Sequence, residues 1–461
     1  MLDKKLLLDV LKKTMSYGGE YADMFIEQRK PLSIHLEDNR VEKVITGIDC
    51  GAGIRLVYKG KSAYAYSNDL SEKSLLKAAS EVSRTASGAA SDAIIIDLRT
   101  RTPSVSFDIK LFPESIPIGE KISLVRRADN VARSFNPKIR QVNVMYRDSI
   151  QRVQIATSDG IIVEDERVHT LIAVQVIAAD GDIIQTGYEP AGGFIGFELF
   201  DDMDIEELSL KAAKRAVMML NAKQAPGGRI PVVISSNAGG TMIHEAIGHG
   251  LEADLAQQGL SVYSKKIGKQ VASSLITVID DSTIPQKRGS FRFDDEGTPS
   301  RKTVLVENGI LKCYMYDRLT AIKDGVRSTG NGRRESYQHR PIPRMTNTFI
   351  SPGEISPEEI LRSVENGLLV EKMGGGQVNT VTGDFVFEVQ EGYLINKGKR
   401  GEPVRGATLI GNGPDVLRSI DMVGSDLGFS IGTCRKDGQG VPVSDAMPTL
   451  RIPEMVVGGK V

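Results

Sequence analysis

Apolar and polar positions follow two periodic patterns in the first half of the chain. Helical spacing of apolar residues, which gathers them on one face, occurs in four segments: residues 2–15, 71–86, 120–135 and 205–220. Alternation of apolar and polar residues, typical of half-buried strands, fills two segments: residues 21–66 and 141–177. Ser71 is placed to cap the second helix. Helices interleaved with antiparallel strands predict an α+β fold.

The pattern changes after the Pro- and Gly-rich segment 224–228, which we take as a domain boundary. Beyond it the chain is glycine-rich and strand-like, apart from helices expected near residues 239–256 and 357–366. We therefore predict an N-terminal α+β domain over residues 1–223. A β-rich C-terminal domain would follow over residues 229–461.

The composition narrows the class of protein. The chain has 461 residues, of which 40% are hydrophobic and 25% charged, unlike a disordered protein. Lys and Arg (58) nearly cancel Asp and Glu (59), so we expect no general binding to nucleic acid. Three scattered cysteines exclude a disulfide framework and favour a reducing compartment. No signal peptide is evident, and the most apolar stretch, 171–179, is too short to cross a bilayer. We expect a soluble cytoplasmic protein without a membrane partner.

Two of the five histidines, His244 and His249, lie close together with Glu245 directly after the first. Zinc-peptidase helices usually space two histidines four residues apart, with a glutamate base between them. Here the spacing is five, and on a regular helix that rotates the rings to about 140° apart. A π-bulge, with its i→i+5 hydrogen bond, would return both rings to one face. We therefore predict a π-bulge or helix break between them, tolerated at Gly248.

A catalytic zinc needs a third protein ligand and an open position for water. Glu252 and Asp254 follow His249 closely, whereas Cys434 lies in a distant segment between glycines, which predicts a loop. Spacing alone does not choose among these three. Cys50 and Cys313 sit in strand-like contexts and are expected to be small core residues.

The metal motif and later blocks resemble the TldD/PmbA family of zinc metallopeptidases, specifically its TldD branch. The matching blocks run in order along the second half: residues 244–254, 289–297, 330–337, 343–348, 374–378, 406–411 and 432–434. The first half resembles the family only in length and layout. The resemblance implies one zinc per chain bound by His244, His249 and Cys434, with Glu245 as general base.

The resemblance also implies partners and substrates. Family members form dimers around an enclosed cavity, either with themselves or with a PmbA-type paralogue that lacks the histidine pair. They are tied to trimming unfolded or leader peptides, and some were first described as gyrase modulators. We expect a homodimer or such a heterodimer acting on unfolded or extended peptides.

Five further residues are candidates for substrate binding. Arg334, Tyr337 and His339 lie in one basic segment, and either of the last two could stabilise an oxyanion. The alternative is a basic surface loop, or one that binds nucleic acid. Asp295, in an acidic run, could hold a substrate amine or form a solvated turn. Gly375 lies in a glycine run without the Lys-Ser/Thr of a phosphate loop, so it could allow close approach of an extended peptide that adds as a strand.

Two functions compete at this level. One is a zinc peptidase in which Glu245 acts as base on a water activated by the metal. The other is a regulatory, peptide-binding protein whose metal is structural. A structural zinc is normally closed by four protein ligands, and only three strong candidates occur here, which favours the peptidase.

Overall fold

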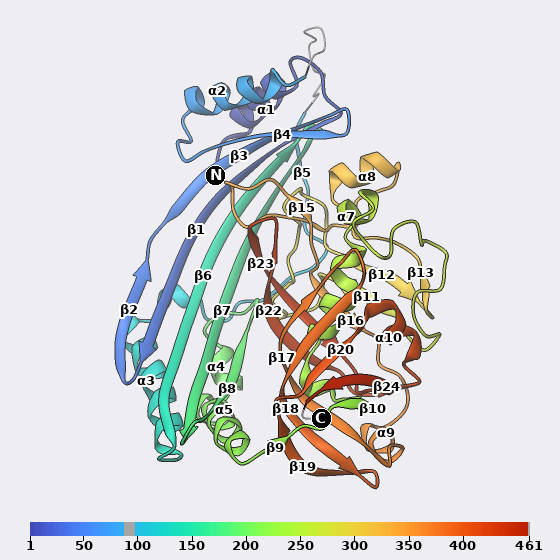
Figure 1. Ribbon diagram of the computed structural model, residues 1–461. Helices are drawn as coiled ribbons and strands as arrows, with labels where there is room; N and C mark the ends of the chain where they lie inside the picture. The colour runs from blue at the N-terminus through green and yellow to red at the C-terminus, as the bar shows by residue number, and fades with distance from the viewer. Residues whose placement is uncertain (87–96, 460–461) are drawn as a thin grey trace.

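The computed structural model describes residues 1–86 and 97–459 (Figure 1). The first half is built on one long twisted sheet in the order β4-β3-β1-β6-β7-β5, with β2 paired to β1 and β8 to β7. Its strands are β1 (Tyr21–Glu37), β2 (Arg40–Thr46), β3 (Asp49–Tyr58), β4 (Lys61–Ser67), β5 (Arg99–Thr100), β6 (Ile139–Thr157), β7 (Ile161–Asp180) and β8 (Ile183–Gly193).

Two helix pairs cover one face of this sheet at its opposite ends. One pair is α1 (Lys4–Thr14) with α2 (Glu72–Ser83), and the other is α3 (Ile118–Ser134) with α5 (Ile205–Leu220). Even-numbered residues of β1 supply both buried clusters, with Met24 under the first pair and Ile34 under the second. The odd-numbered side of the sheet faces the second half of the chain, where Phe25 packs against Phe293. The short elements η1 (Pro113–Ser115) and α4 (Leu199–Asp202) complete this half.

The predicted α+β class is confirmed, and the helical segments lie where apolar spacing put them. Ser71 caps α2, since its hydroxyl accepts a hydrogen bond from the amide of Ser74. The meander differs from the expectation in one respect, because β1 is a central strand. Its whole length from Asp23 to Glu37 pairs with β6, a strand that begins about 100 residues later.

The second half contains two larger sheets and a two-stranded one. In the first, the order is β17-β10-β24-β20-β18-β19-β9, and β17 also pairs with β18, so five of these strands form a closed ring. Its strands are β9 (Lys223–Gln224), β10 (Gly228–Ile234), β17 (Asn366–Val378), β18 (Asp384–Asn396), β19 (Lys399–Arg405), β20 (Thr408–Asn412) and β24 (Leu450–Gly458), with β21 (Met422–Val423) on β24.

The second sheet has the order β13-β12-β11-β16-β23-β22. Its strands are β11 (Val278–Asp281), β12 (Lys302–Glu307), β13 (Ile310–Leu311), β16 (Asn347–Ile350), β22 (Gly428–Lys436) and β23 (Gln439–Met447); β14 (Gly332–Arg333) pairs separately with β15 (Ile342–Pro343). The helices of this half are α6 (Thr241–Ile243), α7 (Ala253–Gln257), α8 (Arg318–Asp324), α9 (Pro357–Arg362) and α10 (Gly413–Ser419), with a 3-10 turn η2 (Ser236–Ala238).

Two expectations for this half are corrected. The helix expected near 239–256 is not continuous. It passes from α-helix to π-helix and then to a 3-10 turn, and it breaks at Glu252, whose backbone is extended. The helix expected near 357–366 ends at Arg362, since the next strand, β17, begins at Asn366. The predicted boundary at 224–228 falls between β9 and β10, which both belong to the ring sheet. Within the described parts of the chain, no helix is long and apolar enough to cross a membrane.

Candidate metal centre

His244 begins a single turn of π-helix, η3 (His244–Gly248), and His249 follows it as the first residue of the 3-10 turn η4 (His249–Leu251). The amide of His249 donates to the carbonyl of His244, which is the predicted i→i+5 hydrogen bond. The two imidazole centroids are 4.9 Å apart and the ring planes cross at 86°. The predicted π-bulge is therefore confirmed, and it brings both rings to one side.

Gly248 permits this turn for a reason that differs from the expectation. Its backbone is helical, with φ −53° and ψ −59°, so the turn does not need the conformational freedom of glycine. A Cβ added there would lie 2.2 Å from the sulfur of Met345. The glycine is required because the turn packs closely against its neighbours in the core.

Cys434 completes a cluster with the two histidines. It lies in strand β22 opposite Val441 of β23, which corrects the expectation of a loop. One ligand atom from each of the three residues lies within 4.8 Å of the others, and Cys434 Sγ is 3.6 Å from His249 Nε2. On a tetrahedral zinc, with Zn–S about 2.3 Å and Zn–N about 2.0–2.1 Å, such a nitrogen and sulfur lie roughly 3.5 Å apart. The spacing of Cys434 Sγ and His249 Nε2 therefore fits a shared zinc.

The other two ligand candidates have different partners. Glu252 is fully buried and its carboxylate lies 3.0 Å from His249 Nδ1, while Lys436 Nζ lies 3.1 Å from the same carboxylate. Lys436 also pairs with Asp254 at 2.7 Å. Although burial opposes ionisation, Lys436 and His249 lower the pKa of Glu252 to about 2. Glu252 thus orients the His249 ring from behind, as carboxylates do for many metal-binding histidines, and leaves Nε2 free toward Cys434.

The donor atoms themselves are suited to a cation. Although burial opposes it, His244 and His249 lower the pKa of the Cys434 thiol to about 5, which favours the thiolate that binds zinc. The buried Nδ1 of His244 makes no hydrogen bond among the described residues, with the carboxylate of Asp445 at 3.6 Å. Asp445 is thus the carboxylate beside the His244 ring, as Glu252 is beside the His249 ring.

Glu245 lies beside the cluster in an open cleft of about 400 Å³. The cleft is lined by His244, Glu245, His249, Val378, Thr380, Thr433, Cys434, Arg435 and Lys436. Burial raises the pKa of Glu245, and the two histidines act in the opposite direction. This carboxylate is the one acidic group on the wall of the cleft, so it is placed to exchange a proton with whatever the cleft holds.

Arg334 and Asp295 are not brought to this cleft. Both belong to a buried ionic cluster between the two halves, here termed the interface network: Asp23, Arg55, Arg167, Asp295, Glu296 and Arg334. Arg334 lies 3.2 Å from Asp23, and its amide donates to Asp295, which also accepts from Arg167 at 2.6 Å. Their charged groups are thus occupied in joining the halves.

Tyr337 and His339 also lie away from the cleft. The ring of Tyr337 packs against the N-terminal sheet, where a Cβ on Gly51 would lie 2.2 Å from it. Its amide donates to Glu27 and its hydroxyl donates to Asp49 at 3.2 Å. His339 Nδ1 lies 3.1 Å from the Ser336 hydroxyl. Their proposed oxyanion role has no geometric support in this chain.

Gly375 lies near the cleft, at the exposed end of β17, where an added Cβ would meet nothing within 4 Å. The neighbouring Gly376 is tightly packed, since its Cβ would lie 1.9 Å from the ring of Phe387. The approach of an extended peptide to this glycine run stays a prediction. Beyond Val370, the edge of β17 opposite β18 has no strand partner among the described residues. This open edge leads to Val378 on the cleft wall.

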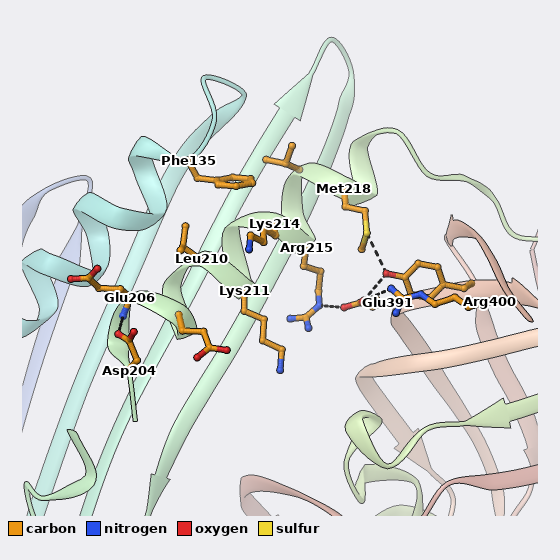
Figure 2. Close-up of a pocket in the computed structure, with 13 residues that line it drawn as sticks. Phe135, Asp204, Glu206, Leu210, Lys211, Lys214, Arg215, Met218, Glu391 and Arg400 are labelled. Atoms are coloured by element: carbon orange, nitrogen blue, oxygen red, sulfur yellow. Dashed lines mark hydrogen bonds and ion pairs between the residues drawn. The ribbon is translucent and has the colours of Figure 1, made fainter. Parts of the chain in front are cut away.

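A larger cavity, of about 920 Å³, lies elsewhere (Figure 2). It separates α5 from β18 and β19, and its most constrained groups are Arg215, paired with Glu391 at 2.6 Å, and Arg400, stacked 3.6 Å over Tyr393. It contains neither histidine nor cysteine. A search for the functional site by volume alone would favour this cavity, but His244, His249 and Cys434 lie in the smaller cleft.

Two residues that support the metal cluster were not predicted from the sequence. Lys436 follows Cys434 by two residues and holds Glu252, and Asp445 lies across the β22–β23 hairpin near His244. The proximity of Lys436 to the cysteine was a usable signal. Nothing in the sequence marked Asp445, because its place depends on the register of the hairpin.

Comparison with known proteins assigns the whole chain to one family. Models of the PmbA/TldA metallopeptidases match in order: domain 1 at residues 22–86, the central domain at 112–220 and the C-terminal domain at 227–459. A metalloprotease TldD homolog of Buchnera aphidicola is 37% identical to this chain. The alignment covers 96% of this chain and 93% of the relative's chain.

Two more distant proteins extend the comparison. A zinc metalloprotease TldD homolog of Saccharolobus solfataricus is 27% identical, with 98% of this chain and 99% of its own covered. A crystal structure from Thermotoga maritima, described as a candidate modulator of a DNA gyrase, superimposes with a TM-score of 0.79 at 22% identity, covering 95% of this chain and 96% of its own. At that identity the last likeness concerns the fold alone.

Proposed function

The chain belongs to the PmbA/TldD family of metallopeptidases, and from this premise we propose that it is a zinc-dependent peptidase with Glu245 as general base. The observation that carries the proposal is a cluster of three donors at an open cleft. Among the described residues no fourth His, Cys, Asp or Glu joins His244, His249 and Cys434. Three protein ligands with an accessible fourth side are the arrangement of catalytic zinc, whereas structural zinc is closed by four.

The chemistry divides between the ion and the protein. Zinc held by the three residues would supply a Lewis acid that polarises a carbonyl and acidifies water. Glu245 would take a proton at its carboxylate and return it to the leaving amine of the cleaved bond. Glu252, through its 3.0 Å contact with Nδ1, would keep the His249 ring in the orientation that exposes Nε2.

Unfolded or leader peptides are the proposed substrates. The open edge of β17 between Val370 and Val378 offers unpaired main-chain groups that end at the cleft. An extended peptide could add there as a further strand, a mode that recognises the main chain and tolerates varied sequences. A reducing, cytoplasmic setting is part of the proposal, because a thiolate ligand such as Cys434 is open to oxidation.

The test is Glu245→Gln, measured by zinc content and by cleavage of an unstructured peptide such as casein fragments. We expect near-stoichiometric zinc and a loss of cleavage of about 10²–10⁴-fold, the usual contribution of general acid–base catalysis. Glu166→Gln is the matched control, since this half-buried carboxylate on β7 pairs with Arg152 and does not line the cleft. Full cleavage by Glu245→Gln would refute Glu245 as the base. A wild type that binds zinc but cleaves nothing would instead favour the regulatory peptide-binding function with a structural metal.

A further inference from the structure

Three arginines gather beside the cleft without carboxylate partners. They are Arg29 on β1, Arg147 on β6 and Arg288 in the segment between β11 and β12. Within the described chain, no Asp or Glu oxygen lies within 4.0 Å of any of their guanidinium groups. The whole chain is nearly neutral, so this local excess of positive charge is a distinct feature of the surface.

The register of the sheet explains how they come together. Arg29 lies opposite Gln151, and Arg147 lies opposite Ser33, so these two arginines are on the same odd-numbered side, four positions apart along the strands. The row between them contains His169, whose Nε2 lies 3.2 Å from the carbonyl oxygen of Arg288. The backbone of Arg288 is therefore held over the row that separates Arg29 from Arg147.

The side chain of Arg288 connects this group to the cleft. Its Nε donates to the carbonyl of Gly432 at 3.1 Å, and its Nη2 donates to the hydroxyl of Thr433 at 3.4 Å. Thr433 lines the cleft and directly precedes Cys434. Arg435, on the other side of the cysteine, is exposed and also lines the cleft. A peptide that leaves the cleft past Thr433 would thus meet the three arginines.

The surrounding carboxylates of the described chain form no ion pair with these arginines. Burial, together with the charges of Arg147 and Arg29, lowers the pKa of Arg288 to about 10. The carboxylates nearest Arg29 have other partners. Asp49 faces Arg29 in the register but accepts from a tyrosine hydroxyl, and Glu27 accepts from a glutamine amide and a backbone amide. Asp295 and Glu335 line one cavity with Arg29, but Asp295 pairs with Arg167 and Glu335 accepts from the amide of Gly440.

The remaining neighbours are Tyr188, His169, His35 and Lys43, which add no negative charge at neutral pH. Within the described chain no carboxylate therefore pairs directly with these guanidinium groups, although guanidinium normally binds carboxylates in that way.

We propose that Arg288, Arg147 and Arg29 form an anion subsite that binds a carboxylate of the peptide substrate beyond the cleft. This inference rests on the proposed peptidase function and names the substrate class: peptides with an acidic residue, or a free C-terminus, on the side of the scissile bond that passes Thr433. Guanidinium groups bind carboxylates through paired, charge-assisted hydrogen bonds, and a partly buried setting strengthens them.

The experiment uses a fixed unstructured peptide in which one Glu is moved along the sequence, each form paired with its Gln counterpart. Every peptide is made with a free and with an amidated C-terminus, which separates the two sources of carboxylate. We expect the zinc-loaded wild type to prefer one Glu position, or the free C-terminus, by about tenfold in kcat/KM over the uncharged form. Added salt should reduce this preference.

The variants locate the effect. Arg147→Gln and Arg288→Gln should each remove most of the preference, measured in each variant as the ratio of kcat/KM between the charged and the uncharged peptide. Arg147 is exposed, so its replacement does not threaten folding. Arg126→Gln is the matched control, because this exposed arginine lies on α3, on the opposite face of the sheet. Binding of labelled peptides to Glu245→Gln gives a second readout that needs no cleavage.

The outcomes separate the two proposals. A wild type that cleaves Glu and Gln peptides equally would overturn the anion subsite while leaving the peptidase intact. A preference that persists in both arginine variants would overturn it as well. A protein that binds acidic peptides through these arginines but cleaves none of them would retain the subsite and refute the peptidase.

Discussion

The metal cluster and the interface network are both buried groups of charged residues, yet their chemical states differ. In the interface network every charge has a partner, as when Arg55 bridges Asp23 and Glu296. In the metal cluster two imidazoles and a thiol converge instead at an open cleft. Although the Nε of Arg334 makes no hydrogen bond, each guanidinium of the interface network is paired with a carboxylate, and such a cluster stabilises contact between parts of a fold. Ligand atoms that converge at an open cleft are available to bind an ion or a substrate.

Removing a ligand from the metal cluster should have the largest effect of all the substitutions considered. Cys434→Ala should abolish stoichiometric zinc and cleavage together, because two histidines alone hold zinc weakly. The loss in metal affinity should exceed the roughly 10–100-fold that follows removal of an outer partner. Metal analysis by mass spectrometry checks this, with Cys313→Ala as the control, since burial raises the pKa of that half-buried thiol to about 11. Retention of zinc in Cys434→Ala would shift the third ligand elsewhere.

The matching change in the interface network should affect stability and not the metal. Arg55→Ala leaves the buried carboxylates of Asp23 and Glu296 without their cation, which costs about 3–5 kcal/mol when a buried pair is broken. Urea unfolding measures this, and zinc per folded protein should not change. Arg152→Ala is the control on the same sheet, because its pair with Glu166 is partly exposed and contributes about 0–1 kcal/mol. Equal losses in the two variants would contradict the prediction.

A third substitution tests the layer behind the metal. Glu252→Gln keeps the size of the side chain but removes the charge that orients His249, so we expect zinc affinity to fall about 10–100-fold. Competition with a chelator measures it. Asp254→Asn is the comparison variant, since that carboxylate contacts Lys436 and not the histidine, and it should have the smaller effect. The reverse order would mean that Asp254, and not Glu252, controls the site.

Local elements were predictable from the sequence because local rules determine them. The helices follow from apolar spacing and from caps such as Ser71, and the π-turn follows from the five-residue spacing of His244 and His249. The central position of β1 was not predictable, because its pairing with β6 depends on contacts between distant segments. The strand at Cys434 was missed for the same reason, since glycines around it favoured a loop and only pairing with β23 shows otherwise.

Residue type alone could not separate the two buried clusters. Arg334 and Asp295 have the chemistry of substrate-binding groups, and spacing gives no sign that each is already paired. From the sequence, Glu252 was as good a candidate for the third metal ligand as Cys434. In the structure its carboxylate contacts His249 and Lys436 instead. What distinguishes a functional group from a structural one is whether its partners are already present, and that depends on tertiary contacts.

The smallest expected effect is also the sharpest test of this distinction. Tyr337→Phe removes the hydroxyl that donates to Asp49 but keeps the ring packed on Gly51, so stability should fall by about 0.5–1.5 kcal/mol. Removing a true oxyanion donor would instead lower kcat by about 10²–10³. Tyr64→Phe is the matched control, because that hydroxyl donates to the carbonyl of Tyr337 within the same contact. Unchanged kcat in both variants, with a small loss of stability, would assign both tyrosines to the contact between the halves. A loss of kcat confined to Tyr337→Phe would mean that a residue of the contact between the halves takes part in catalysis. The interface network and the metal cluster would then not be functionally separate.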